Sequence, residues 1–133
     1  MSKTALIVDD STTMRRMVGL TLREAGFEVI ESANGREGLG QLETCGVDII
    51  ITDVHMPVMD GLAMVQAVRG RPKHRFTPIL ILTTESGDEM KRRGKEAGAS
   101  GWIVKPFNPK QLREVVYRLL RLPSDTPMES KSA

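Results

Sequence analysis

The chain has 133 residues, enough for one domain with a buried core but too few for a catalytic domain joined to a separate output domain. Its composition, 40% hydrophobic and 27% charged, is that of a globular protein, and no apolar run approaches the roughly 20 residues that span a bilayer. The net charge of +2 combines an acidic half, residues 1–67, with a basic half, residues 68–121. Aromatic residues make up only 4% and are not interleaved with basic ones, so nucleic-acid binding is not expected.

The first residues predict a cytoplasmic protein. Only four apolar residues precede Asp9 and Asp10, which is too short a run for a signal peptide. Cys45 is the single cysteine, so an internal disulfide is excluded, as suits a reducing compartment. We therefore expect a cytoplasmic monomer whose output passes through another molecule.

Short apolar runs rich in β-branched residues predict strands covered on both faces, as in parallel sheets. These runs are residues 5–8, 49–51, 79–82 and 102–104. Residues 27–31 alternate more between apolar and polar and predict an edge strand.

Helical patterns separate the predicted strands. Apolar residues spaced by three and four predict a first helix that ends before Gly26. Its buried stripe is expected to comprise Met14, Met17, Val18, Thr21, Leu22 and Ala25. A second helix begins at Asn34, with Glu37 placed as in a capping box, and a third follows residues 60–61.

The last two helices differ in their apolar anchors. The final one is the clearest, because Asn108 can cap it, Pro109 suits its first turn, and residues 112–120 carry a continuous apolar stripe. The fourth, residues 87–97, has only Met90 and Ala97 as anchors and contains Gly94, so we expect weak packing.

Alternating strands and helices predict an α/β domain of the (βα)5 type, with a doubly wound parallel sheet in the flavodoxin-like order 2-1-3-4-5. We assign this domain to residues 1–122. Residues 123–133 lack periodicity and predict a disordered tail.

Polar residues stand where the predicted strands end: Asp9, Asp10, Asp53, Thr83 and Lys105. The carboxyl ends of parallel strands share one edge of the sheet, where ligands bind, so these side chains are expected to converge. Three crowded carboxylates need a cation, and an oxygen-only site without clustered His or Cys favours Mg²⁺, with Mn²⁺ as a substitute.

The lysine and the hydroxyl at this edge favour phosphoryl chemistry, because phosphoryl oxygens need cationic and hydrogen-bonding partners. A carboxylate can itself accept a phosphoryl group, and Asp53 is the central candidate. Each residue has a duller interpretation taken alone: Asp9 and Asp10 could cap a helix, Thr83 could end a strand, and Lys105 could be a solvated charge.

Four segments carry a resemblance to a known family. They are Val8-Asp9-Asp10-Ser11, residues 52–61, Thr83-Thr84-Glu85 and Val104-Lys105-Pro106-Phe107. In this order and spacing, they make residues 3–121 resemble the receiver domain of two-component response regulators, and specifically the single-domain chemotaxis regulators of the CheY type.

The resemblance implies a phosphorelay function. Asp53 would accept a phosphoryl group from a sensor histidine kinase. Asp10, Asp53 and the backbone carbonyl of His55 would bind Mg²⁺, with Asp9 contributing through water. Thr83 and Lys105 would contact the phosphoryl oxygens, and the bond between Lys105 and Pro106 would be cis. The domain would catalyse its own phosphorylation and dephosphorylation without being an enzyme for another substrate.

The resemblance also implies a switch in which Thr83 and Trp102 respond to phosphorylation. The affected surface, formed by residues 87–97, 102–104 and 109–120, would bind a downstream target such as a flagellar motor switch protein, and a phosphatase is a further expected partner. Its cations suit an acidic segment. Trp102 is bulkier than the usual residue there, and His55 and Glu85 are expected to tune dephosphorylation.

Three alternatives remain at this point. A phosphohydrolase with an aspartyl-phosphate intermediate would need a general-acid carboxylate where this chain has His55. A flavodoxin-like cofactor carrier would need a phosphate-binding first loop, which Asp9 and Asp10 oppose by charge. A stand-alone receiver could also serve as a phosphate sink or scaffold regulator outside motility.

Overall fold

In the computed structural model, residues 2–123 are described, so the predicted tail lies outside the described residues except for Pro123. Five parallel strands form one sheet in the order β2-β1-β3-β4-β5, which confirms the predicted topology. The strands are β1 (Thr4–Val8), β2 (Glu28–Ser32), β3 (Ile49–Thr52), β4 (Ile79–Thr83) and β5 (Gly101–Val104). The edge strand β2 begins one residue later than the alternation predicted.

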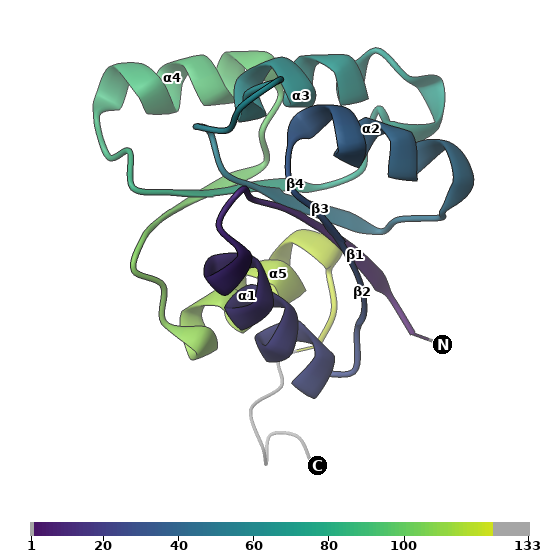
Figure 1. The fold of residues 1–133 in the computed structure, drawn as a ribbon. Coiled ribbons are helices and arrows are strands. Elements are labelled where there is room, and N and C mark those ends of the chain that lie inside the picture. Colours follow the sequence, from purple (N-terminus) through teal and green to yellow (C-terminus); the bar gives the residue numbers. More distant parts are fainter. Residues whose placement is uncertain (1, 124–133) are drawn as a thin grey trace.

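The helices sandwich the sheet (Figure 1). They are α1 (Thr12–Glu24), α2 (Gly35–Thr44), α3 (Gly61–Arg69), α4 (Asp88–Ala97) and α5 (Pro109–Leu120), and the short 3-10 helix η1 (Pro72–His74) follows α3. Helices α1 and α5 cover one face of the sheet, and α2, α3 and α4 cover the other (Figure 1). None of the helices within residues 2–123 has the length and hydrophobicity that a bilayer crossing requires.

The central strands supply both halves of the core because successive side chains point to opposite faces. Leu6, Ile50 and Ile81 belong to the core cluster under α2, α3 and α4, whereas Ile7 and Ile51 belong to the cluster under α1 and α5. All five are at most 1% exposed. Burying one such side chain contributes about 1.5–3 kcal/mol, so the sheet is a rigid base for the residues at its edge.

Local capping agrees with the sequence in α2 and α5 but not in α1. Asn34 accepts a hydrogen bond from the Glu37 amide at 3.0 Å, and Asn108 caps α5. Helix α1 is capped by Ser11, whose hydroxyl accepts from the Met14 amide at 3.2 Å. The interpretation of Asp9 and Asp10 as caps of this helix is therefore wrong.

The predicted apolar stripe of α1 is only partly buried. Val18, Thr21 and Leu22 face the sheet, but the side chain of Met17 is half exposed. The expectation for Met17 is wrong because, at 3.6 residues per turn, Met17 falls at the edge of the stripe centred on Val18, Thr21 and Leu22.

Candidate functional site

Backbone hydrogen bonds extend the sheet beyond its strands and set the positions of the charged residues. The Asp9 amide donates to the Ser32 carbonyl at 3.1 Å, and the Asp53 amide donates to the Val8 carbonyl at 3.1 Å. The Lys105 amide donates to the Thr83 carbonyl at 2.7 Å. These bonds continue the parallel ladder by one residue, so the side chains after β1, β3 and β5 leave the sheet at a common edge.

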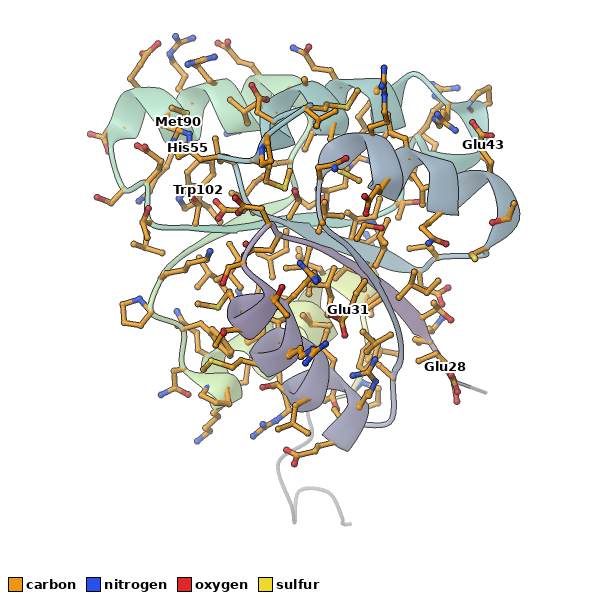
Figure 2. The ribbon with its side chains drawn as sticks, viewed as in Figure 1. Glu28, Glu31, Glu43, His55, Met90 and Trp102 are labelled. Carbon is orange, nitrogen blue, oxygen red and sulfur yellow. The ribbon has the colours of Figure 1, made fainter. Side chains whose placement is uncertain are left out.

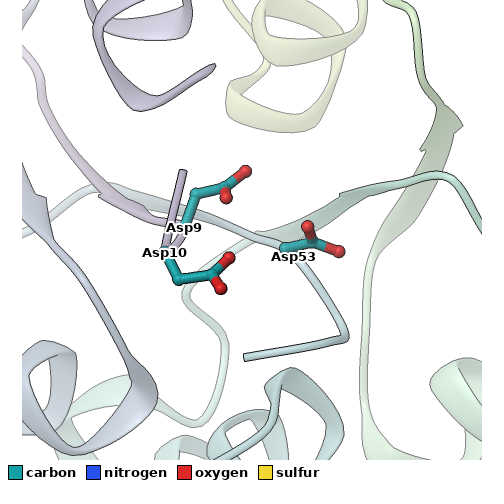
Figure 3. A group of neighbouring side chains, drawn as sticks. All are labelled: Asp9, Asp10 and Asp53. Carbon is teal, nitrogen blue, oxygen red and sulfur yellow. The ribbon is translucent and has the colours of Figure 1, made fainter. Parts of the chain in front are cut away.

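The three aspartates come together as predicted. One carboxylate oxygen from each of Asp9, Asp10 and Asp53 can be chosen so that all lie within 4.8 Å of one another. Asp9 is buried, Asp53 is half-buried and Asp10 is exposed. Figure 3 shows the three side chains side by side beyond the ends of β1 and β3. The cluster is therefore closed on the Asp9 side and open to solvent at Asp10.

Lys105 supplies the positive charge of this cluster. Its Nζ donates to Asp53 Oδ2 at 2.8 Å and to Asp9 Oδ2 at 2.9 Å. Only 11% of the lysine side chain is exposed. Burial lowers its pKa, but the hydrogen bonds to Asp53 and Asp9 raise it more, so the pKa lies above the ordinary lysine value. Lys105 is thus a charged member of the site, and its interpretation as a solvated surface charge is wrong.

Asp53 is held as a carboxylate from several sides. Burial raises its pKa, but hydrogen bonds from Lys105 and Thr83 and from the Val54 amide lower it more, and the net pKa is below the ordinary value. The Val54 amide donates to Asp53 Oδ1 at 2.6 Å. Thr83 is fully buried at the end of β4. At neutral pH this carboxylate is ionised and oriented.

The loop after Asp53 depends on a close backbone approach. Helix α3 begins at Gly61, where an added Cβ would come within 1.9 Å of the Asp53 carbonyl oxygen. The Gly61 amide donates to the Val54 carbonyl at 2.8 Å, and Asp60 caps the helix through the Ala63 amide. Any larger residue at 61 would displace the carbonyl of the central aspartate.

Two side chains meet at the mouth of the site. His55 Nε2 and Glu85 Oε2 lie 2.5 Å apart, joining the loop after β3 to the loop after β4. The sequence placed both residues near the site but did not predict this pairing, because 30 positions separate them. The imidazole is held by a carboxylate and remains 59% exposed.

Trp102 lies one element away from the aspartates, on β5. Its Nε1 donates to the Glu85 carbonyl oxygen at 2.9 Å, so the indole is tied to the same loop as the His55–Glu85 pair. The residue is half-buried and packs against the core cluster under α4. The peptide bond between Lys105 and Pro106, just beyond β5, is cis.

Arg15 also belongs to the surroundings of the site, although the sequence patterns did not point to it. Its Nη1 donates to the Asp9 carbonyl oxygen at 2.7 Å, and its Nε donates to Glu31 at 3.1 Å. The side chain thereby fixes the loop that carries the acidic pair. The available signal was the place of Arg15 in the first turn of α1, five residues after Asp10.

The donor set suits a hard divalent cation. Carboxylate oxygens converge from Asp9, Asp10 and Asp53. Among the described residues, this cluster contains neither a cysteine sulfur nor a histidine nitrogen. Mg²⁺ and Mn²⁺ prefer such oxygen ligands. Lys105 bonds one oxygen each of Asp9 and Asp53, which leaves three carboxylates facing a single ammonium group.

A scan against family models matches residues 5–117 to the response regulator receiver domain. The chain therefore belongs to the response regulator receiver family, and within it to the CheY-like receivers, as two comparisons show. Chemotaxis protein CheY1 of Helicobacter pylori is 40% identical over 111 residues, which cover 82% of this chain and 90% of that protein.

Solved structures agree. Chemotaxis protein CheY4 of Vibrio cholerae is 49% identical, with a TM-score of 0.87 over 90% of this chain and 99% of that one. The receiver domain of sensor histidine kinase PA1611 from Pseudomonas aeruginosa is 25% identical, with a TM-score of 0.84 over 91% and 99% of the two chains. That structure has a magnesium ion coordinated in its active site cleft.

Proposed function

We propose that the protein is a phosphorelay regulator of the chemotaxis type, in which Asp53 accepts a phosphoryl group from the phosphohistidine of a sensor histidine kinase. The observation that carries this proposal is the Asp53 carboxylate, ionised and bonded to Lys105 within a cluster of three aspartates. An ionised, oriented carboxylate is a competent nucleophile, and its product is an acyl phosphate that can hydrolyse.

A Mg²⁺ ion would be held by Asp9, Asp10, Asp53 and the backbone carbonyl of His55, with Mn²⁺ as a substitute. When bound, the ion would supply the charge that brings a phosphoryl group and the carboxylates together. A magnesium-bound relative and the acidic cluster support this assignment.

The residues around Asp53 would orient its carboxylate and contact the incoming phosphoryl group. Backbone amides of Val54 and His55 hold Oδ1 at 2.6 and 3.4 Å. Lys105 bonds Oδ2, so its ammonium stands where phosphoryl oxygens would develop negative charge. Thr83 would add a hydroxyl donor on the same side. The chain would therefore catalyse its own phosphorylation and dephosphorylation as a signalling domain rather than as an enzyme for another substrate.

The His55–Glu85 pair would tune dephosphorylation by controlling access to the acyl phosphate. The pair joins the loop after β3 to the loop after β4. His55 follows Asp53 by two residues, and Glu85 follows Thr83 by two residues. Because the imidazole is engaged by a carboxylate and lies at the exposed rim, we assign it a positioning role rather than that of a general base.

The output surface would be the face formed by α4, β5 and α5, switched through Thr83 and Trp102. Arg92 is paired on its own helix with Glu89 and Glu96. Arg93 lies on the side of α4 that faces α3, so the positive charge offered to a partner on this face rests on the exposed Lys91, Lys95 and Lys110. These cations suit an acidic segment of a downstream protein. The chemotaxis relatives favour a flagellar motor switch protein in the cytoplasm, with a phosphatase as a further partner.

Phosphorylation can be tested without the kinase. The purified protein is incubated with Mg²⁺ and a small acyl-phosphate donor, and intact masses are compared for wild type, Asp53→Asn and the control Asp60→Asn. We expect one phosphoryl adduct on wild type and control, none on Asp53→Asn, and none without a divalent cation. An adduct on Asp53→Asn, or no adduct on wild type, would contradict the proposal.

The output is tested separately by deleting the encoding gene and tracking swimming cells. Loss of reversals or tumbles, restored by wild type but not by Asp53→Asn, supports motor control. Unchanged swimming would instead favour a phosphate sink or a scaffold regulator outside motility.

A further inference from the structure

The indole of Trp102 is held in a slot with two walls. On one side, its Nε1 bonds the Glu85 carbonyl at 2.9 Å. On the other, its six-membered ring lies against α4 at Gly94, where an added Cβ would come within 2.6 Å of Cζ3 and 3.2 Å of Cε3. Figure 2 shows Trp102 beneath α4, close to Met90 and His55. We call the space between Gly94 and the Glu85 carbonyl the indole slot.

Helix α4 packs against α3 and, through Gly94, against the Trp102 ring. Gly94 and Ala97 are the buried residues of the helix, and neither carries a side chain larger than a methyl group. Met90 is only half-buried. An aromatic side chain buries more area than any other kind, so Trp102 is the largest apolar partner available to this helix.

The glycine at 94 has no other evident reason to be there. In a helix interior, glycine lowers the folding equilibrium constant about two- to fivefold relative to alanine. Gly94 lies within α4 rather than at its end, and the helix terminates separately at Gly98, whose φ is +116°. The absence of a side chain at 94 is what leaves room for the indole.

The slot is also linked to the phosphorylation site. The Glu85 amide donates to Thr83 Oγ1 at 3.4 Å, while the Glu85 carbonyl accepts from Trp102. A movement of the Thr83 hydroxyl toward a phosphoryl group would therefore break the hydrogen bond that the Glu85 amide makes to Thr83, and Glu85 is the residue whose carbonyl holds the indole.

We propose that Gly94 is a positioning residue that seats Trp102 in the indole slot and thereby sets the position of α4, including the exposed Lys91 and Lys95 that a partner would contact. A side chain at 94 unseats the indole and displaces the helix. The role in partner recognition rests on the proposed function, whereas the Gly94–Trp102 contact does not require phosphorylation.

The test compares two glycine-to-alanine changes in helix interiors. Gly40 lies in α2, and a Cβ there would meet nothing within 4 Å, so Gly40→Ala is the matched control. Each change is made with Trp102 present and in a Trp102→Ala background, and urea unfolding is followed by circular dichroism on unphosphorylated protein.

We expect Gly40→Ala to raise the folding equilibrium constant about two- to fivefold in both backgrounds. With Trp102 present, Gly94→Ala should lower the folding equilibrium constant about tenfold, because overpacking outweighs the gain in helix propensity. With Trp102 absent, Gly94→Ala should raise the constant as the control does. Acrylamide quenching of Trp102 should increase in Gly94→Ala. A Gly94→Ala protein that folds only in the Trp102→Ala background would show the same reversal of sign.

Stabilisation by Gly94→Ala with Trp102 present, or unchanged quenching, would overturn the proposal. Gly94→Ala should still form the phosphoryl adduct on Asp53, since it leaves the aspartates untouched. Absence of the adduct in wild type would refute the proposed function while the folding comparison still decides the role of Gly94.

Discussion

Removal of the Lys105 ammonium tests the electrostatics of the site. The change is Lys105→Met, which keeps most of the apolar stem and deletes the charge between Asp9 and Asp53. At 2.8 and 2.9 Å, each Coulomb attraction is about 6 kcal/mol at an effective dielectric constant of 20. Dehydration of the three charges offsets most of this, so the pair itself has a small net worth.

The variant nevertheless loses more free energy of unfolding than the ion pair itself contributes. Two carboxylates with side-chain exposures of 6% and 12% then face each other without a counter-charge. Removing one member of a buried ion pair costs about 3–5 kcal/mol. Because Asp10 leaves the cluster open to solvent, we expect the lower end, about 3 kcal/mol at pH 7 without divalent cations. Urea unfolding measures this difference in the free energy of unfolding.

The difference should depend on pH and metal. The pKa of Asp53 is lowered in the folded protein, so its stabilising contribution is present above the ordinary value of 3.8 and is lost as pH falls through the folded pKa. The gap between wild type and Lys105→Met should therefore begin to narrow as pH falls below 3.8, and should keep narrowing as Asp53 takes up its proton. Mg²⁺ should stabilise the variant more than wild type.

Lys91→Met is the matched control, since Lys91 is exposed and outside the site. It should stay within about 0.5 kcal/mol of wild type. If Lys105→Met also stays within that range at pH 7, the reasoning that places Lys105 between the two carboxylates is refuted.

Three further substitutions probe the surroundings. Gly61→Ala should lower the free energy of unfolding in urea by about 3 kcal/mol or more and slow adduct formation, because its Cβ would meet the Asp53 carbonyl at 1.9 Å. An unchanged free energy of unfolding would contradict this. Arg69→Met should lower the free energy of unfolding by about 3 kcal/mol, since Arg69 donates to the carbonyls of His74, Thr77 and Gly98 at 2.7–3.0 Å. The control Arg71→Met should leave the free energy of unfolding nearly unchanged. His55→Ala should change the decay rate of the phosphoryl adduct by less than about 100-fold, and a larger effect would indicate a general base.

The fold was predictable because its signals are local. Apolar runs mark the central strands, and their alternation with helices leaves few topologies once crossovers are right-handed. The convergence of Asp9, Asp53 and Lys105 followed from the same logic, because the carboxyl ends of parallel strands share an edge. These contacts span up to 96 positions, yet they needed no information beyond strand order.

Side-chain pairings were less predictable, because they depend on the geometry of the loops rather than on the spacing of apolar residues along the chain. His55 and Glu85 meet only because the loops after β3 and β4 turn toward each other. The sequence left open whether Asp9 or Asp10 caps α1, whereas Ser11 does, since all three are good N-caps and the exact helix start decides among them. Gly94 was seen as a weakness of α4, whereas the structure shows it making room for Trp102.

The identity of the phosphorylated residue tests the central claim most directly. The protein is phosphorylated with a small acyl-phosphate donor and Mg²⁺, and the product is reduced with borohydride, which converts an aspartyl phosphate to homoserine. Peptide sequencing by mass spectrometry should find homoserine at position 53 alone. Homoserine at Asp9 or Asp10, or at no position, would contradict the assignment of Asp53 as the phosphoryl acceptor.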